Sequence, residues 1–187
     1  MRTLITLLAL TATMAEATAQ VTINGVTLPA NLKAGDKTLV LNGGGIRKKA
    51  FFKLYTGGLY IEAKTKDAKA IIAADKPMAM RLQITSSIIS SDNMSEAIRE
   101  GFEKSTKGNT APLKAKIDKF VSTFAKEEIV ENNVFDIIYI PGKGVEAHKN
   151  GKVQNTIDGL DFKKALFGIW FGDDPVDSDL KASLLGN

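Results

Sequence analysis

Residues able to carry out acid–base, nucleophilic or metal chemistry are scarce in this chain. His148 is the only histidine, and it stands beside the turn-forming pair Asn150-Gly151, where we expect a solvent-exposed residue at a hairpin tip. A Ser-His-Asp or Cys-His unit would have to use this histidine. The chain has no cysteine, which excludes thiol catalysis and cysteine-bound metals. We therefore assign no catalytic residue, no metal ligand and no cofactor.

The acidic residues near the C-terminus have the composition of a calcium-binding loop without its spacing. They are Asp173, Asp174, Asp177 and Asp179. An EF-hand loop requires glycine at its sixth position and glutamate at its twelfth. Counted from Asp173, these positions hold Ser178 and Leu184. We expect the four carboxylates to cap a helix and to form a charged surface turn.

A glycine run followed by basic residues is the next candidate site. Gly43-Gly44-Gly45 precedes Arg47, but the run lacks the G-K-[ST] ending and the strand-to-helix context of a phosphate-binding loop. We expect a tight bend before a strand instead. The guanidinium group of Arg47, between this bend and an apolar strand, can bind a carboxylate or a carbonyl oxygen. An ordinary surface arginine is the alternative.

Alternating or β-branched segments predict strands in the first half of the chain. These cover residues 21–29, 37–42, 51–62 and 78–86. Gly57-Gly58, in the middle of the third segment, indicates a bend or a close approach of another backbone. Tyr55 and Tyr60 are five residues apart in the same strand, so they must face opposite sides of the sheet.

Helical periodicity begins at Met94. Apolar residues recur at i, i+3, i+4, i+7 and i+8 in Met94, Ala97, Ile98, Gly101 and Phe102, and then with helical spacing in Leu113, Ile117, Phe120, Val121 and Phe124. Two further helices are expected near the C-terminus. Asp161 can cap the first, which Gly172 would end, and Ser178 starts the second, which runs through Leu185.

Strands return between these two pairs of helices. Residues 134–140 and 145–157 have strand character, and Asn150-Gly151 supplies the positive-φ pair of a type I′ hairpin. Strands, two helices, a hairpin and further helices predict an α+β domain whose largely antiparallel sheet is covered by helices on one face.

The first nineteen residues, MRTLITLLALTATMAEATA, predict a secretory signal peptide. Arg2 is followed by an apolar run from Leu4 to Leu10 and a small-residue cleavage pattern at Ala17-Thr18-Ala19. The run is far shorter than the roughly 18 residues that span a bilayer. We therefore expect cleavage near Gln20, export from the cytosol, and no transmembrane segment in the mature chain.

Residues 20–187 have the length of one domain, which can bury a core without disulfides. The formal net charge is +4, and removal of the predicted signal leaves it unchanged because one arginine and one glutamate are lost. The lysines are scattered among acidic residues. This pattern excludes nucleic acid as a partner, since its binding needs a concentrated basic surface.

Four segments in order resemble the chalcone isomerase-like family, most closely its exported bacterial branch. They are GGGIRKKAFFKLYTGGLYIE (43–62), EAIREGF (96–102), YIPGKGVEAHKNGK (139–152) and DFKKALFGIWFGDDPVDSDLKASLLG (161–186). The resemblance implies an open-faced β-sandwich, in which a large antiparallel sheet is overlaid by helices with the ligand cleft between the two layers. The likeness to exported bacterial relatives also implies the periplasm as the destination of the exported chain.

The resemblance also implies which residues line that cleft. The family's arginine matches Arg47, and the next active-site position, a threonine in the plant enzymes and often a tyrosine in fatty-acid-binding relatives, matches Tyr55. The catalytic tyrosine, the asparagine and a late hydroxyl residue are replaced by Met94, Gly101 and Ile169. Such replacements remove the groups that position a chalcone. They argue against true chalcone isomerase activity.

The leading hypothesis is an exported, non-enzymatic binder of a small amphipathic carboxylate such as a fatty acid. Arg47 and Tyr55 would hold the head, and the tail would contact Met94, Ile98, Phe102, Ile169 and Trp170. Two alternatives stay open. The first is an isomerase or intramolecular lyase acting on a chalcone-like enone, with Arg47 as electrophile and Tyr55 positioning a proton or water. The second is a protein-interaction module of the envelope.

Overall fold

A seven-stranded antiparallel sheet is the framework of the protein. The computed structural model describes residues 20–187, so the predicted signal peptide lies outside the described residues. The strands follow one another in chain order across the sheet. They are β3 (Asn31–Ala34), β4 (Lys37–Lys49), β5 (Phe52–Ile61), β6 (Met78–Ile84), β7 (Val134–Ile140), β8 (Gly144–Lys149) and β9 (Lys152–Ile157).

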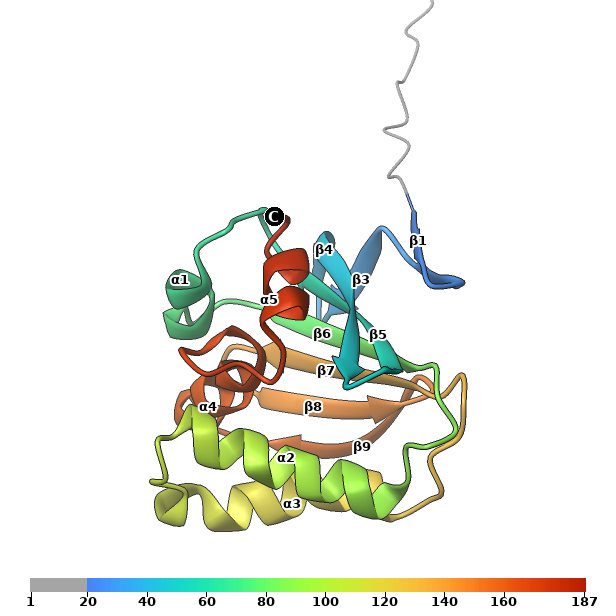
Figure 1. Cartoon of the computed structure of the whole chain (residues 1–187). Coiled ribbons are helices and arrows are strands. Elements are labelled where there is room, and N and C mark those ends of the chain that lie inside the picture. Colours follow the sequence, from blue (N-terminus) through green and yellow to red (C-terminus); the bar gives the residue numbers. More distant parts are fainter. Residues whose placement is uncertain (1–19) are drawn as a thin grey trace, which may run out of the picture.

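Helices cover one face of this sheet, as Figure 1 shows. They are α1 (Ala68–Ala73), α2 (Ser91–Ser105), the 3₁₀ turn η1 (Ala111–Leu113), α3 (Lys114–Ala125), α4 (Leu160–Phe171) and α5 (Ser178–Leu184). Their apolar faces pack on the inward side chains of the strands in one continuous core. The predicted α+β open-faced β-sandwich is confirmed.

A smaller core lies on the opposite face of the sheet. It includes Leu28, Leu39 and Tyr60, whereas Tyr55 belongs to the helix-covered core. The expectation that the two tyrosines face opposite sides is therefore correct. The hairpin of β1 (Val21–Ile23) and β2 (Val26–Leu28) contributes to this second core and forms a separate two-stranded sheet.

That hairpin corrects the prediction of one strand over residues 21–29. Asn24 and Gly25 adopt φ of 51° and 76° and turn the chain back on itself. The alternation of side chains is real, but an Asn-Gly pair divides it. The same signal at Asn150-Gly151, with φ of 49° and 78°, makes the predicted turn between β8 and β9.

The glycine run is the second correction. Gly43, Gly44 and Gly45 do not form a bend before a strand; they lie inside β4 and pair with β5. A Cβ atom at Gly43 would lie 2.3 Å from the carbonyl oxygen of Ser183 and 2.7 Å from that of Leu184. Gly43 and Gly45 therefore lack side chains because α5 packs directly against this strand, whereas a Cβ atom at Gly44 would meet Leu28 and Ile23 on the other face.

Helix termini differ from the prediction in one place. Gly159, not Asp161, is the N-cap of α4, and the carboxylate of Asp161 lies 3.0 Å from the ammonium of Lys116. Gly172 ends α4 as expected, and Asp177 caps α5 by accepting a hydrogen bond from the amide of Leu180. The short helix α1 was not predicted, because six residues do not carry a helical repeat.

Candidate functional site

A cavity of about 270 Å³ opens between the sheet and the helical layer. Six of the seven predicted binding residues line it, namely Arg47, Tyr55, Met94, Ile98, Ile169 and Trp170. They come from β4, β5, α2 and α4, so three distant parts of the sequence meet here. The volume is near the lower end of the roughly 300–1,000 Å³ typical of small-molecule pockets.

Phe102, the seventh predicted residue, does not line the cavity. It is fully buried, and its ring lies 5.5 Å from that of Phe162 and 6.2 Å from that of Phe120. Eight residues along a helix rotate a side chain by about 80°. Phe102 therefore points away from the cavity that Met94 faces and belongs to the core between α2, α3 and α4.

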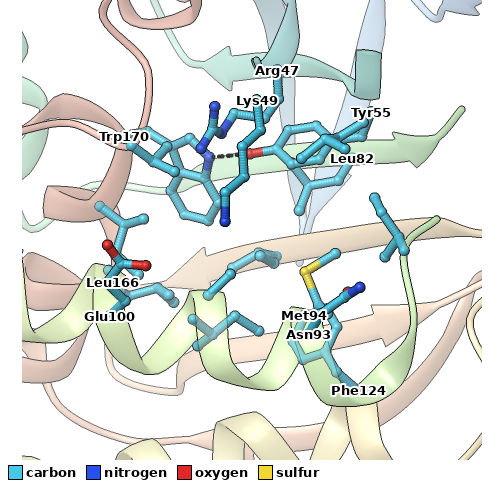
Figure 2. A pocket seen from close by; sticks show the side chains of 18 of the residues that line it. Arg47, Lys49, Tyr55, Leu82, Asn93, Met94, Glu100, Phe124, Leu166 and Trp170 are labelled. Atoms are coloured by element: carbon cyan, nitrogen blue, oxygen red, sulfur yellow. Dashed lines mark hydrogen bonds between the residues drawn. The ribbon is translucent and has the colours of Figure 1, made fainter. Parts of the chain in front are cut away.

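The cavity has one polar end. In Figure 2, Arg47, Tyr55 and Trp170 lie together on one side, while Met94 and Phe124 lie on the other. Most of the remaining lining is apolar and includes the buried side chains of Leu82, Phe120 and Ile137, while Asn93 and Glu100 lie on the side of Met94. An apolar chamber with polar groups at one end suits a ligand with a polar head and a hydrocarbon body.

Tyr55 is held at the polar end by a single hydrogen bond. The indole Nε1 of Trp170 donates to its hydroxyl oxygen over 3.0 Å. Burial raises the pKa of Tyr55 to about 12, so the phenol is protonated at neutral pH. Within residues 20–187 the hydroxyl hydrogen has no acceptor. Tyr55 is therefore a hydrogen-bond donor available to a ligand, and a poor general base.

Arg47 lies beside Tyr55 for a reason of strand register. The two residues are direct partners across β4 and β5, so their side chains leave the same face of the sheet. A register shift follows immediately, with Lys48 opposite Lys53, and leaves Leu54 without a partner on β4. This bulge allows both Leu54 and Tyr55 to line the cavity.

The guanidinium group of Arg47 is fixed from the other side by α5. Its Nη1 lies 3.5 Å from Oδ2 of Asp177 and also donates to the carbonyl oxygen of Lys48. The same Oδ2 accepts a hydrogen bond of 3.0 Å from the Lys48 amide. Both charged side chains are mostly buried, with 14% and 11% of their surface exposed. Asp177 thus orients Arg47 and partly neutralises it.

The close packing of α5 on the glycines of β4 makes this contact possible. Gly45 lies under the same helix, where a Cβ atom would be 2.7 Å from that of Ser183. With α5 at this distance, its N-cap reaches the end of β4 that carries Arg47. The glycine run therefore serves the site indirectly, by admitting the helix that holds its arginine.

The three residues that the resemblance aligns with polar positions of the family all lie in the cavity wall. They are Met94, Gly101 and Ile169. A Cβ atom at Gly101 would lie 2.9 Å from Cγ2 of Ile169. Glycine on α2 and isoleucine on α4 are thus fitted to one another. An asparagine at position 101 has no room beside this isoleucine.

The rim of the cavity carries four charged residues that were not predicted from the sequence as part of the site. Lys49, Glu100, Lys104 and Asp174 line the cavity and are exposed. The Lys104 ammonium lies 3.5 Å from the Asp174 carboxylate. The i, i+3 and i+7 spacing of Ala97, Glu100 and Lys104 on the predicted helix offered a signal. Asp174 had none, because a loop brings it to α2.

His148, Asp173 and Asp174 contact nearby charged side chains. His148 is not the exposed hairpin-tip residue that was predicted: it lies within β8 on the face of the sheet away from the cavity, only 16% exposed, with its Nε2 3.1 Å from Oε2 of Glu146. Asp173 and Asp174 pair with Lys107 and Lys104, which fits the predicted surface turn. No cluster of three or more metal-ligating side chains is found between residues 20 and 187.

The architecture and the whole described chain match a known family. The family model described as chalcone isomerase-like matches residues 20–186. The chain belongs to the chalcone isomerase-like family. The resemblance seen in the sequence is therefore confirmed. No curated protein sequence is similar enough to the chain to match it.

A solved structure shows the same fold. It is a fatty-acid binding protein of Arabidopsis thaliana, with a TM-score of 0.72 and 19% sequence identity. The match covers 89% of this chain and 96% of the plant protein. At this identity the likeness establishes the chalcone isomerase-like fold.

Proposed function

We propose that the protein binds a fatty acid or a similar amphipathic carboxylate in the cavity between β5 and α2, without converting it. The observation that carries the proposal is an apolar cavity closed at one end by a protonated Tyr55 hydroxyl and by Arg47. The plant relative of the same fold is described as a fatty-acid binding protein, which supports this ligand class.

The head group of such a ligand has two donors to meet. Tyr55 offers its hydroxyl hydrogen, and Arg47 offers the N–H groups that do not contact Lys48 and Asp177. Hydrogen bonds to a charged carboxylate are roughly twice as strong as neutral ones. Asp177 opposes this binding by its own charge, so Tyr55 is expected to supply a large share of the head-group affinity.

The hydrocarbon tail would lie against the apolar walls of the cavity. Met94, Ile98 and Ile169 line the cavity together with Phe120 and Phe124. Each methylene removed from water contributes about 0.8 kcal/mol. Affinity should therefore rise with chain length until the tail outgrows the cavity.

Catalysis of an enone cyclisation has little support from this geometry. The buried Tyr55 does not ionise near neutral pH, and the residues aligned with the family's other catalytic groups are apolar. The isomerase alternative would rely on Arg47 alone to stabilise developing charge. Turnover of a chalcone that disappears in Arg47→Ala would favour it over simple binding.

The test is a titration of residues 20–187 with fatty acids of increasing length, read by native mass spectrometry. We expect one ligand per chain and a loss of about tenfold or more in affinity for Arg47→Ala. Arg99→Ala is the matched control, since Arg99 is exposed and pairs with Asp118 outside the cavity. Unchanged binding in Arg47→Ala would overturn the proposal.

Export remains a proposal that rests on the sequence of residues 1–19. Among the residues that the structure describes, no helix is long and apolar enough to cross a membrane. Cleavage before Gln20 and a periplasmic location can be checked by expressing the full chain and determining the N-terminus and the compartment of the product. An intact N-terminus in the cytosol would contradict both.

A further inference from the structure

Two phenylalanines are exposed to solvent at the turn between β4 and β5. Phe51 is fully exposed, and Phe52 keeps 53% of its surface exposed. Ala50 adopts the positive φ of the turn, at 52°. The geometry of the turn therefore does not require an aromatic residue at either of the next two positions. We call residues 48–53 the aromatic tip.

Exposure of this degree is unusual for phenylalanine. Aromatic side chains of this size are normally buried because they remove a large apolar area from water. The other exposed large apolar residues of the described chain keep between 40% and 54% of their surface in water. Phe51 therefore has the properties of a residue kept for contact with something outside the chain.

The aromatic tip is also basic. Lys48, Lys49 and Lys53 flank the two phenylalanines, and residues 43–61 contain no aspartate or glutamate. Within residues 20–187 none of these three ammonium groups lies within ion-pair distance of a carboxylate. Lys53 donates to the side-chain oxygen of Asn24 and so keeps its charge uncompensated. The tip combines exposed aromatic surface with three free positive charges.

The aromatic tip borders the mouth of the cavity. Lys49, which belongs to the tip, and Leu54, the residue directly after it, both line the cavity. The neighbouring loop is tied to it by a hydrogen bond of 3.0 Å from the Thr85 amide to the Leu54 carbonyl. That loop presents Ile88, which is 46% exposed and also lines the cavity. The aromatic tip and the exposed side chain of Ile88 thus both lie at the cavity rim.

We propose that the aromatic tip docks on a bilayer surface that contains anionic lipids. Phe51 and Phe52 enter the headgroup region, and Lys48, Lys49 and Lys53 face the lipid phosphates. The docking proposal depends only on the exposure and charge of the aromatic tip. A second inference rests on the proposed function. A cavity mouth held against the bilayer lets an amphipathic carboxylate pass between membrane and protein without crossing water.

Charge complementarity favours a membrane over a second copy of the chain. In a symmetric dimer through this tip, the same surface of each copy would meet. Three lysines would then face three lysines, and like charges at short range repel. An anionic lipid surface has the opposite sign and accommodates aromatic side chains at its interface.

The test is sedimentation of residues 20–187 with two kinds of vesicle, one of phosphatidylcholine and one that also contains phosphatidylglycerol. We expect binding to the second kind only, weakened by salt. Phe51→Ser should weaken it about tenfold or more, and Lys48→Gln/Lys53→Gln by about fivefold for each lysine removed. The matched controls Val153→Ser and Lys152→Gln, both exposed on β9, should bind like the original chain.

The docking proposal would be overturned if Phe51→Ser bound the vesicles as well as the original chain does. It would also be overturned if the original chain bound neither kind of vesicle. A dimer in sedimentation velocity that Phe51→Ser abolishes would assign the tip to a second copy. Fatty-acid binding in solution should be unchanged in Phe51→Ser, because Phe51 does not line the cavity. Vesicle binding without fatty-acid binding would leave docking standing and remove the proposed function.

Discussion

The indole Nε1 of Trp170 donates a 3.0 Å hydrogen bond to the Tyr55 hydroxyl, which joins α4 to β5 at the polar end of the cavity. Both side chains are buried, with 5% and 7% of their surface exposed. The bond has two roles. It satisfies the only polar atom of a buried indole, and it leaves the phenol with a hydrogen to donate.

Tyr55→Phe should damage stability and binding together. The indole N–H loses its acceptor in a buried position, so the free energy of unfolding should fall by about 1–3 kcal/mol. The carboxylate ligand loses one donor and should bind about tenfold more weakly. Urea unfolding should be followed by circular dichroism, because the control below removes Trp170, the only tryptophan.

The double variant Tyr55→Phe/Trp170→Phe is the control for this effect on stability. Removing both partners avoids an unpaired polar group, so its loss should be smaller than the sum of the two single losses. Additive losses would show that the bond does not couple the two residues.

Asp177→Asn should strengthen ligand binding while it weakens the fold. The variant removes the negative charge beside Arg47, so affinity for a carboxylate should rise by about tenfold at most. Asparagine caps a helix as well as aspartate, but its amide cannot accept from both Leu180 and Lys48. Isothermal titration with a fatty acid measures the first effect.

Asp179→Asn is the matched control for this experiment. Asp179 lies in the first turn of the same helix and is exposed. It should change neither affinity nor stability by more than a small amount. Weaker ligand binding in Asp177→Asn would mean that the orientation of Arg47 by Asp177 favours binding more than the negative charge of Asp177 disfavours it.

Gly43→Ala should detach or shift α5. Its Cβ atom would come within 2.3 Å of the Ser183 carbonyl oxygen, which is backbone and cannot rotate away. We expect a loss of about 1–3 kcal/mol in unfolding free energy and weaker fatty-acid binding, because Asp177 moves with the helix. Gly108→Ala, which meets no atom within 4 Å, should cost only its backbone strain at φ of 84° and leave binding unchanged. Equal effects on binding would contradict the role given to the glycine run.

Lys163 should give the protein a pH-dependent stability. The side chain is fully buried, and its ammonium donates to the carbonyl oxygens of Ile71, Ile72 and Ala74 at the end of α1. Burial lowers the pKa of Lys163 from 10.5 to about 8. Between these values the unfolded chain binds more protons than the folded one. The free energy of unfolding should therefore rise with pH above about 8.

Lys163→Met is the control, because it removes the titrating group. It should be less stable at pH 7 by about 1–3 kcal/mol, since three carbonyl groups lose their donor. It should also lack the rise between pH 8 and 9.5. The comparison ends at pH 9.5 because buried tyrosines have the opposite effect at higher pH. Burial raises the pKa of Tyr55 and Tyr139 to about 12, which lowers the free energy of unfolding above pH 10. Parallel pH profiles of the two proteins would contradict the role of Lys163.

The sequence by itself determined the class of fold and, with the family resemblance, six of the residues that line the cavity. Asn150-Gly151 specifies a turn through its φ angles, and the spacing of Met94, Ile98 and Phe102 specifies a helix, because these are local properties of the chain. It also placed Tyr55 and Tyr60 on opposite faces, since strand geometry alone decides that.

Only the tertiary structure decided what each of these residues contacts. Asp177 meets Arg47 from 130 positions away, and Gly43 is glycine because α5 lies against it. Phe102 shares a helical face with Met94 in the sequence pattern, yet it packs on Phe162. Periodicity gives the direction of a side chain relative to its own helix, whereas its partner depends on how helices and sheet close over one another.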